Sequence, residues 1–362
     1  MNFKSIRRTA VPGVAALALL MSACGASNEE GGDDSSDGLT GNLTGGGATS
    51  QEKAQDAWKT NFQGKNSGLT IDYRLLGSTD GRSQFISKAL SFAGSDSYIK
   101  DEDLEKAKER CGGTIVEVPA YISSIAIAFN VPGVDELKLD ADTIAKIFDN
   151  KITKWNDKAI ADQNEGVELP DLKISPVHRS DDSGTTKNFT DYLGKVAPDS
   201  WKYEAEDAFP VSGGLSAEGT SGVVKQVTDT EGTIGYADAS QTGDLKHVSV
   251  KVGEEYVAPS PEGAAKTVEV SPTVEGRDAT DIAVDVDRTT TEAGAYPVIL
   301  LSYLIACEKY DDATEAANVK GYFEYIVSDE GQAASAENAG SAKLAPATAT
   351  KAQEIVAKIS AN

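Results

Sequence analysis

Several kinds of chemistry have little support in the sequence, because the residues and motifs that they need are rare or missing. The 362 residues include only two histidines, His178 and His247, and three cysteines. No group of these residues has the spacing of a metal site. The P-loop motif G-x-x-x-x-G-K-[ST] and the nucleophile elbow G-x-S-x-G are both missing. The sequence therefore predicts no metal site, no cofactor and no catalytic residue.

Basic residues are also in short supply. The chain has 34 Lys and Arg against 57 Asp and Glu, which gives a formal net charge of −23 at pH 7. Such a chain would repel the backbone of a nucleic acid, and no basic stripe offsets the repulsion. Nucleic acid is therefore excluded as a partner. A small anion is not excluded, because surface charge is screened beyond about 8 Å at physiological salt.

Long apolar runs are scarce, and the first one lies near the N-terminus. Val11–Met21 follows a basic segment and is too short for a confident membrane span, so we interpret residues 1–23 as a signal peptide. The small residues before Cys24 resemble a bacterial lipoprotein signal. This predicts a lipid anchor on Cys24 at the extracytoplasmic face of the cell membrane. The Arg7-Arg8 pair leaves a twin-arginine export route open.

Residues 24–42 are rich in Gly, Ser, Asp and Glu and cannot bury enough apolar surface to fold. We expect them to form a flexible tether between the anchor and a globular body. Beyond Cys24 the chain has two cysteines, Cys111 and Cys307, which can pair only with each other. An exported protein favours a disulfide between them, with two free thiols as the alternative.

The clearest candidate site lies in residues 177–193, where a β-prone run leads through a polar turn into an amphipathic helical pattern. Amides in the first turn of a helix have no intrahelical acceptor and lie at the positive end of its dipole. Here these amides belong to Ser183, Gly184 and Thr185. Arg179 would add a fork of donors, and Asp181 is well placed to orient it. The pattern favours an oxyanion site, although Ser-Gly-Thr before a helix is also an ordinary N-cap.

Two other Gly/Ser/Thr clusters are predicted to open helices in the same way. Gly45–Ser50 precedes one helical pattern, and Gly77–Gly81 lies between a β-prone run and another. Three such clusters in one chain suggest that helix N-termini converge on a small tetrahedral anion. A further cluster, Gly219–Gly222, opens another predicted helix.

Strand and helix patterns alternate from Leu43 to about Lys158, which indicates a layered α/β fold. Ile115–Asn130 is β-prone but contains Pro119, so we expect two strands joined at a bend. Residues 259–281 are rich in Pro, Glu and Thr and show little helical pattern. Residues 296–306 read as an apolar core segment that is too short to span a membrane.

Five short motifs stand along the chain in order. They are Leu43–Thr49 (LTGGGAT), Gly77–Gly81 (GSTDG), Gly94–Asp96 (GSD), Lys151–Asp157 (KITKWND) and Arg179–Thr186 (RSDDSGTT). In order and rough spacing they resemble the phosphate-binding lipoproteins of ABC-type phosphate importers, the PstS family. The similarity covers nearly the whole mature chain.

The resemblance implies a two-lobed periplasmic-binding-protein fold of type II, in which two crossing strands join the lobes and a hinge closes them on the ligand. It assigns residues 43–118 and 256–362 to lobe I and residues 119–255 to lobe II. The implied function is not enzymatic. It is high-affinity extracytoplasmic binding of inorganic phosphate and its delivery to the permease subunits of an ABC transporter.

The resemblance also implies a ligand set. By position, the phosphate ligands are Thr49, Ser50, Ser78, Asp96, Arg179, Ser183, Gly184 and Thr185, with Asp181 orienting the arginine. Ser50 stands where the family usually has Phe; the family's contact there is a backbone amide, so the donor is kept. Asp96 would accept a hydrogen bond from the proton of phosphate and repel sulfate, which carries no proton at neutral pH.

Three other functions remain compatible with the sequence. The first is a binding protein for another oxyanion, such as sulfate or a phosphonate. The second is a secreted phosphatase or esterase with Ser183 as nucleophile and His178 as base, which the missing nucleophile elbow disfavours. The third is a surface adhesion or sensing protein with a vestigial pocket.

Overall fold

The computed structural model describes residues 38–99 and 101–362. The predicted signal peptide, Cys24 and the tether up to residue 37 lie outside the described residues. Thr40–Asn42, which composition assigned to the tether, are instead the first residues of strand β1 (Thr40–Gly47) and pair with strand β2 (Gly68–Leu75). None of the described helices combines the length and the apolar character that crossing a membrane requires.

The other elements alternate as the sequence pattern indicates. The remaining strands are β3 (Phe92–Ser95), β4 (Ile115–Asn130), β5 (Leu137–Leu139), β6 (Ser175–Arg179), β7 (Leu215–Ala217), β8 (Thr233–Asp238), β9 (Lys246–Val252), β10 (Glu255–Val257), β11 (Ile299–Cys307), β12 (Lys309–Tyr310) and β13 (Ser360–Ala361). The α-helices are α1 (Glu52–Lys65), α2 (Ser78–Ile86), α3 (Asp101–Arg110), α4 (Ala141–Phe148), α5 (Lys158–Ala161), α6 (Gly184–Val196), α7 (Gly219–Asp229), α8 (Pro261–Val270), α9 (Ala313–Ile326), α10 (Asp329–Ala339) and α11 (Pro346–Val356). Two short 3-10 helices are η1 (Thr49–Gln51) and η2 (Ala239–Gln241).

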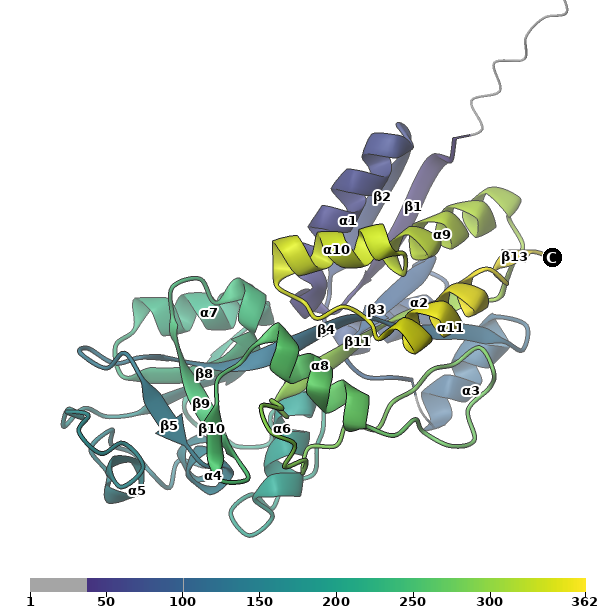
Figure 1. Cartoon of the computed structure of the whole chain (residues 1–362). Coiled ribbons are helices and arrows are strands. Elements are labelled where there is room, and N and C mark those ends of the chain that lie inside the picture. The colour runs from purple at the N-terminus through teal and green to yellow at the C-terminus, as the bar shows by residue number, and fades with distance from the viewer. Residues whose placement is uncertain (1–37, 100) are drawn as a thin grey trace, which may run out of the picture. The chain divides into compact units, whose positions relative to one another are not determined.

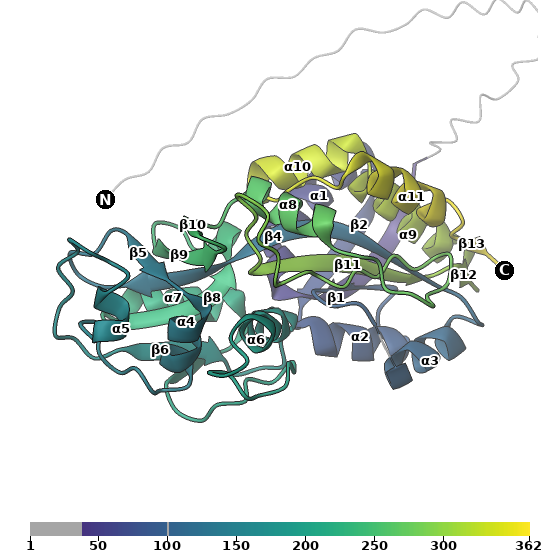
Figure 2. The ribbon, with the colours of Figure 1, turned by 60° about the horizontal axis from the view of Figure 1, so that its bottom comes forward.

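The main sheet has the strand order β2-β1-β3-β11-β4-β8-β6-β7, and β9 joins it at β4. Its long central strand connects two lobes, because Ile115–Ser124 pair with β11 while Ile125–Asn130 pair with β8. In the lobe that contains β1, helices cover both faces of the sheet (Figure 1, Figure 2). Helices α2 and α3 lie on one face, and α1, α8, α9, α10 and α11 lie on the other.

Strand β4 corrects one prediction, because Ile115–Asn130 form one continuous strand and not two. The pairing with β11 shifts between Ser302 and Tyr303, where Tyr303 faces Pro119 and Ser302 faces Tyr121. Ala120 is therefore left over as a bulge. A bulge is a place where a sheet tolerates proline, which lacks an amide donor. The bend expected at Pro119 is thus absorbed within the strand.

In the second lobe, helices also cover both faces of the sheet, as two adjacent residues of β8 show. A Cβ at Gly235 would touch the side chains of Val223 and Val227 on α7. The next residue, Tyr236, points to the opposite face of the strand and stacks on Phe189 of α6 at 4.5 Å between ring centroids. The two faces of this part of the sheet are thus covered by different helices.

Helix α8 corrects a second prediction, since Pro261–Val270 lie in the segment that showed little helical pattern. Its start follows ordinary rules: the side chain of Ser260 accepts a hydrogen bond from the amide of Gly263, and Pro261 occupies the first turn. The apolar run predicted at residues 296–306 supplies the buried strand β11.

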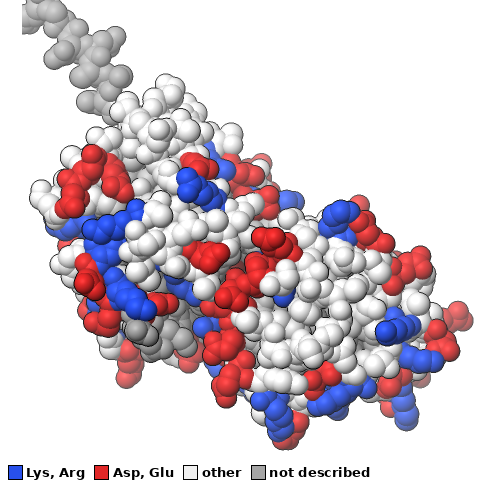
Figure 3. Space-filling view, turned by 180° about the vertical axis from the view of Figure 1, so that it is seen from behind, with Lys and Arg blue, Asp and Glu red and all other residues white. Residues whose placement is uncertain are grey.

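The two cysteines that were predicted to pair are joined by a disulfide. Cys111 lies just after α3 and Cys307 ends β11, with Cα atoms 5.1 Å apart and a sequence separation of 196. On the surface, acidic and basic side chains stand next to one another over the face shown in Figure 3, and the basic ones form no continuous stripe there.

Candidate functional site

The centre of the candidate site is Asp96, which follows β3 and is only 3% exposed. Its carboxylate accepts hydrogen bonds from Ser50 Oγ (2.6 Å, at Oδ1) and Thr185 Oγ1 (3.1 Å, at Oδ2), and the hydroxyl of Ser302 lies close enough to lower its pKa. Burial raises the pKa of Asp96, whereas these hydroxyl groups and the positive charge of Arg179 oppose the rise. The site therefore holds a titratable acceptor within a ring of donors.

Helices α2 and α6 begin beside this carboxylate. Ser78 is the first residue of α2, and its Oγ accepts a hydrogen bond from the amide of Asp96 at 3.1 Å, so its hydroxyl hydrogen can still be donated. Gly184 is the first residue of α6, and a Cβ there would lie 2.6 Å from Ser78 Oγ and 2.7 Å from Asp96 Cβ. Only glycine fits this approach.

Ser183 corrects the expectation that all three amides at the start of α6 are unpaired. Its amide donates to the carbonyl of Asp207 at 2.8 Å, and its Oγ accepts from the amides of Thr185 (3.1 Å) and Thr186 (3.3 Å). Ser183 is therefore the N-cap of α6, as the alternative interpretation held. Of the three amides of Ser183, Gly184 and Thr185, only that of Gly184 has no hydrogen-bond partner among the described residues. The hydroxyl hydrogen of Ser183 remains available as a donor.

Arg179 ends β6 and is 3% exposed. Its Nε donates to Asp181 Oδ1 at 2.8 Å, and its Nη2 donates to Asp181 Oδ2, so the guanidinium is held in one orientation. Burial opposes the ionisation of Asp181, but the hydrogen bonds and charge of Arg179 keep its pKa below the usual value. Nη1 has no hydrogen-bond partner among the described residues and can donate to another acceptor. The pair thus presents a fixed cation to the site.

Thr49 lies at a different edge of the site. Its Oγ1 is 3.0 Å from Thr220 Oγ1 and accepts a hydrogen bond from the amide of Thr220 at 3.3 Å. Gln241 Nε2 donates to the carbonyls of Thr49 (2.9 Å) and Ser50 (3.2 Å). The start of α7 therefore meets the start of η1, which leads into α1. The described residues show no hydrogen bond between Thr49 and Asp96, Arg179 or the start of α6.

Sequence reasoning missed several residues that shape the site. Thr220 belongs to the Gly219–Gly222 cluster, which was recognised as a helix start but not assigned to the site. Ser302 is the one serine in an apolar run, and Gln51 Nε2 donates to its Oγ at 2.6 Å. A hydroxyl inside a buried strand is a usable clue, whereas Gln51 carries no signal in the sequence.

The geometry gives little support to a serine hydrolase. The Nδ1 of His178 lies 2.9 Å from the carbonyl of Arg179, and the imidazole stacks on Phe209 at 4.4 Å between centroids. Both lone pairs of Ser183 Oγ are engaged by backbone amides. Within residues 38–99 and 101–362 there is no Ser183–His178 hydrogen bond, and no group of three or more His, Cys, Asp or Glu could hold a metal ion.

Comparisons with known proteins agree with one another. Residues 32–330 match the PBP superfamily domain. The chain is 32% identical over 338 residues to the phosphate-binding protein PstS2 of Mycobacterium bovis, covering 88% of this chain and 90% of that protein. It is 34% identical over 286 residues to the phosphate-binding protein PstS 3 of Mycobacterium leprae, covering 78% and 77%.

Solved structures share the fold. A high-affinity periplasmic phosphate-binding protein, PfluDING, solved with bound phosphate, matches with a TM-score of 0.72 at 22% identity, over 87% of this chain and 93% of that one. A phosphate-binding protein from Stenotrophomonas maltophilia matches with a TM-score of 0.68 at 20% identity, over 87% and 94%. At these identities the likeness concerns the two-lobed fold.

Proposed function

Because the chain belongs to the PstS family of phosphate-binding proteins, we propose that it binds inorganic phosphate and delivers it to the permease subunits of an ABC transporter. The observation that carries the proposal is the surroundings of Asp96. A single buried carboxylate stands among hydroxyl, amide and guanidinium donors from several distant segments. This arrangement suits an anion that carries a proton of its own.

The chemistry of recognition follows from the donor set. Phosphate oxygens would accept hydrogen bonds from the amide of Gly184, from the hydroxyls of Ser78 and Ser183, and from the guanidinium of Arg179. Asp96 would accept the proton that hydrogen phosphate or dihydrogen phosphate carries. Sulfate has no such proton at neutral pH, so its oxygens would face a buried carboxylate without a hydrogen bond between them. A buried charged group without a partner costs more than about 1 to 3 kcal/mol.

The full proposed ligand set is the one that the family resemblance implies. It comprises Thr49, Ser50, Ser78, Asp96, Arg179, Ser183, Gly184 and Thr185, with Asp181 orienting the arginine. Thr185 would act through Asp96, because its hydroxyl donates to that carboxylate and its amide donates to Ser183. Ser50 stands where the family usually has Phe. Its hydrogen bond to Asp96 supports a role for Ser50 in the site. Thr49 belongs to the set through its amide at the start of η1, where a helical turn leaves its first donors unpaired.

The proposal extends to domains and location. Residues 43–118 with 256–362 form lobe I, residues 119–255 form lobe II, and the protein acts outside the cytoplasm, anchored to the membrane by lipid on Cys24. The double pairing of β4 supports two lobes joined by this strand, with the change of partner between Ser124 and Ile125. We propose no catalytic step; the Nδ1 of His178 lies 2.9 Å from the carbonyl oxygen of Arg179, and the described residues show no hydrogen bond between His178 and Ser183.

Thermal unfolding of the purified protein tests the proposal. A ligand at 100 times its dissociation constant stabilises a folded protein by about 2.7 kcal/mol. We therefore expect phosphate, at concentrations well above its dissociation constant, to raise the melting temperature while equal concentrations of sulfate do not. A melting temperature that phosphate leaves unchanged would refute phosphate binding. Turnover of a chromogenic phosphate ester would refute the assignment as a binding protein alone.

A further inference from the structure

Two buried arginines of lobe I bond to aspartates of lobe II, and each is linked to Asp96 or to its neighbours in the chain. Arg82 of α2 meets Asp207, and Arg288, in the segment before β11, meets Asp191 of α6. The arginine side chains are 8% and 2% exposed. We call these pairs the Arg82 latch and the Arg288 latch.

The Arg82 latch connects lobe II to the residues that flank Asp96. Arg82 Nη1 donates to Ser95 Oγ (2.8 Å) and Ser97 Oγ (3.1 Å), while its Nη2 donates to Asp207 Oδ2 at 2.8 Å. Thr79 Oγ1 donates to the same aspartate oxygen, also at 2.8 Å. One guanidinium thus fixes the loop that carries Asp96 and at the same time bonds to the other lobe.

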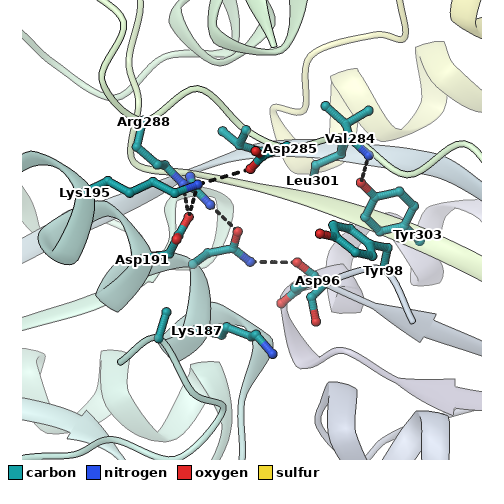
Figure 4. A pocket seen from close by; sticks show the side chains of 14 residues that line it. Asp96, Tyr98, Lys187, Asp191, Lys195, Val284, Asp285, Arg288, Leu301 and Tyr303 are labelled. Carbon is teal, nitrogen blue, oxygen red and sulfur yellow. Dashed lines mark hydrogen bonds and ion pairs between the residues drawn. The ribbon is translucent and has the colours of Figure 1, made fainter. Parts of the chain in front are cut away.

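The Arg288 latch reaches the main chain of Asp96 through Asn188 of α6. Arg288 Nε donates to Asp191 Oδ2 at 3.1 Å, and its Nη2 donates to Asn188 Oδ1. Asn188 Nδ2 in turn donates to the carbonyl of Asp96 at 2.7 Å. Figure 4 shows Arg288 and Asp191 together with Lys195, which forms ion pairs to Asp191 (3.4 Å) and Asp285 (3.1 Å).

The Arg82 latch is poorly suited to a purely structural role, and the Arg288 latch crosses a seam with little apolar packing. Asp207 Oδ1 is buried and has no hydrogen-bond partner, which makes the Arg82 pair a weak source of stability. A cavity of about 230 Å³ lies beside Arg288 and is lined by residues that include Tyr98, Lys187 and Asp285. Because a cavity forfeits dispersion contacts, the seam between α6 and the 284–288 segment depends on its polar bonds.

We propose that the Arg82 and Arg288 latches hold the lobes closed over the ligand and thereby set the rate at which it leaves. The proposal rests on the proposed function, since it assumes that phosphate binds between the lobes. Opening the cleft would separate Arg82 from Asp207, and Arg288 from Asp191 and Asn188. The same movement would remove supports of Asp96, so the acceptor is fully positioned only while the lobes are shut. Arg82 and Arg288 are thus positioning residues.

The test uses the purified full-length protein loaded with radiolabelled phosphate and diluted into unlabelled phosphate. Asp207→Asn and Asp191→Asn keep the shape of the lobe II partner but remove its charge, and charge-assisted hydrogen bonds are about twice as strong as neutral ones. We expect each variant to release phosphate about tenfold faster, and the double variant about a hundredfold faster. Association should change by less than about threefold, because mutations of this kind act mainly on dissociation. Asp199→Asn is the control, since Asp199 is fully exposed and its only ion pair among the described residues, to Lys202, lies within lobe II.

Melting temperatures separate a latch from a structural role. The phosphate-free variants should melt like the wild type if the latches matter only when the lobes are held shut, and their phosphate-induced shift should shrink. Unchanged release rates would overturn the proposal. Equal destabilisation with and without phosphate would overturn it as well, because the aspartates would then serve the fold. Wild-type protein that retains no phosphate would overturn the proposed function itself.

Discussion

Asp96→Asn is the substitution whose effect the structure defines best. The carboxylate is 3% exposed and accepts bonds from Ser50 and Thr185, so the isosteric amide should fit without a cavity. Phosphate would lose a charge-assisted hydrogen bond and keep a neutral one, a loss of about 1 to 1.5 kcal/mol, or roughly tenfold in affinity. Sulfate would no longer face a buried charge and would gain by at least as much.

The preference for phosphate over sulfate should therefore fall by at least about a hundredfold. Isothermal titration calorimetry with both anions measures this ratio directly. Asp72→Asn is the matched control, because it removes the same charge from a side chain that is 58% exposed and paired with Arg74. An unchanged ratio in the Asp96 variant would refute the argument that this carboxylate recognises the proton of the ligand.

The pH dependence of sulfate binding is a second test of the role of Asp96. Burial raises the pKa of Asp96, and a protonated Asp96 could donate to a sulfate oxygen. Sulfate affinity of the wild-type protein should then increase as the pH falls through this pKa, while that of Asp96→Asn stays flat. Parallel pH profiles for the two proteins would contradict the assignment.

Three further outcomes follow from particular contacts. Arg179→Lys keeps the charge but loses the fork that Asp181 orients, so calorimetry should show phosphate affinity falling by about 10- to 100-fold; native affinity would place Arg179 outside the site. Burial raises the pKa of Asp238 to about 6. Its bound proton therefore stabilises the fold below pH 4, and this stability, on the order of 3 kcal/mol, is lost as the pH rises through 6; urea unfolding of Asp238→Asn should lack this slope, and an unchanged slope would show that another group titrates. Replacing Cys111 and Cys307 together by Ala should lower the free energy of unfolding by on the order of 4 to 5 kcal/mol, because the crosslink closes a loop of 196 residues; a loss below about 1 kcal/mol would argue against that entropic account.

The sequence was most informative where local rules decide the structure. Helices η1 and α2 begin inside the clusters Gly45–Ser50 and Gly77–Gly81, and α6 begins directly after Ser183. Capping and the conformational freedom of glycine act over a few residues, so they can be read without knowing the fold. The strong apolar pattern of β11 is local in the same sense.

Features that depend on contacts with residues far away in the chain could not be predicted from the sequence. Pro119 was expected to divide a strand, but the pairing with β11 accommodates it as a bulge at Ala120. The amide of Ser183 is taken by Asp207, which lies in an irregular segment with no recognisable pattern. Arg288 and its bonds to α6 likewise join segments about 100 residues apart. Such contacts are set by the tertiary fold.

The most direct test of the account is a competition titration of the purified protein with phosphate and sulfate near pH 7. We predict saturable binding of one phosphate per chain, little or no binding of sulfate at the same concentrations, and loss of the phosphate signal in Arg179→Ala. Equal binding of the two anions, or no binding of phosphate, would contradict the claim that Asp96 and its ring of donors select a protonated oxyanion.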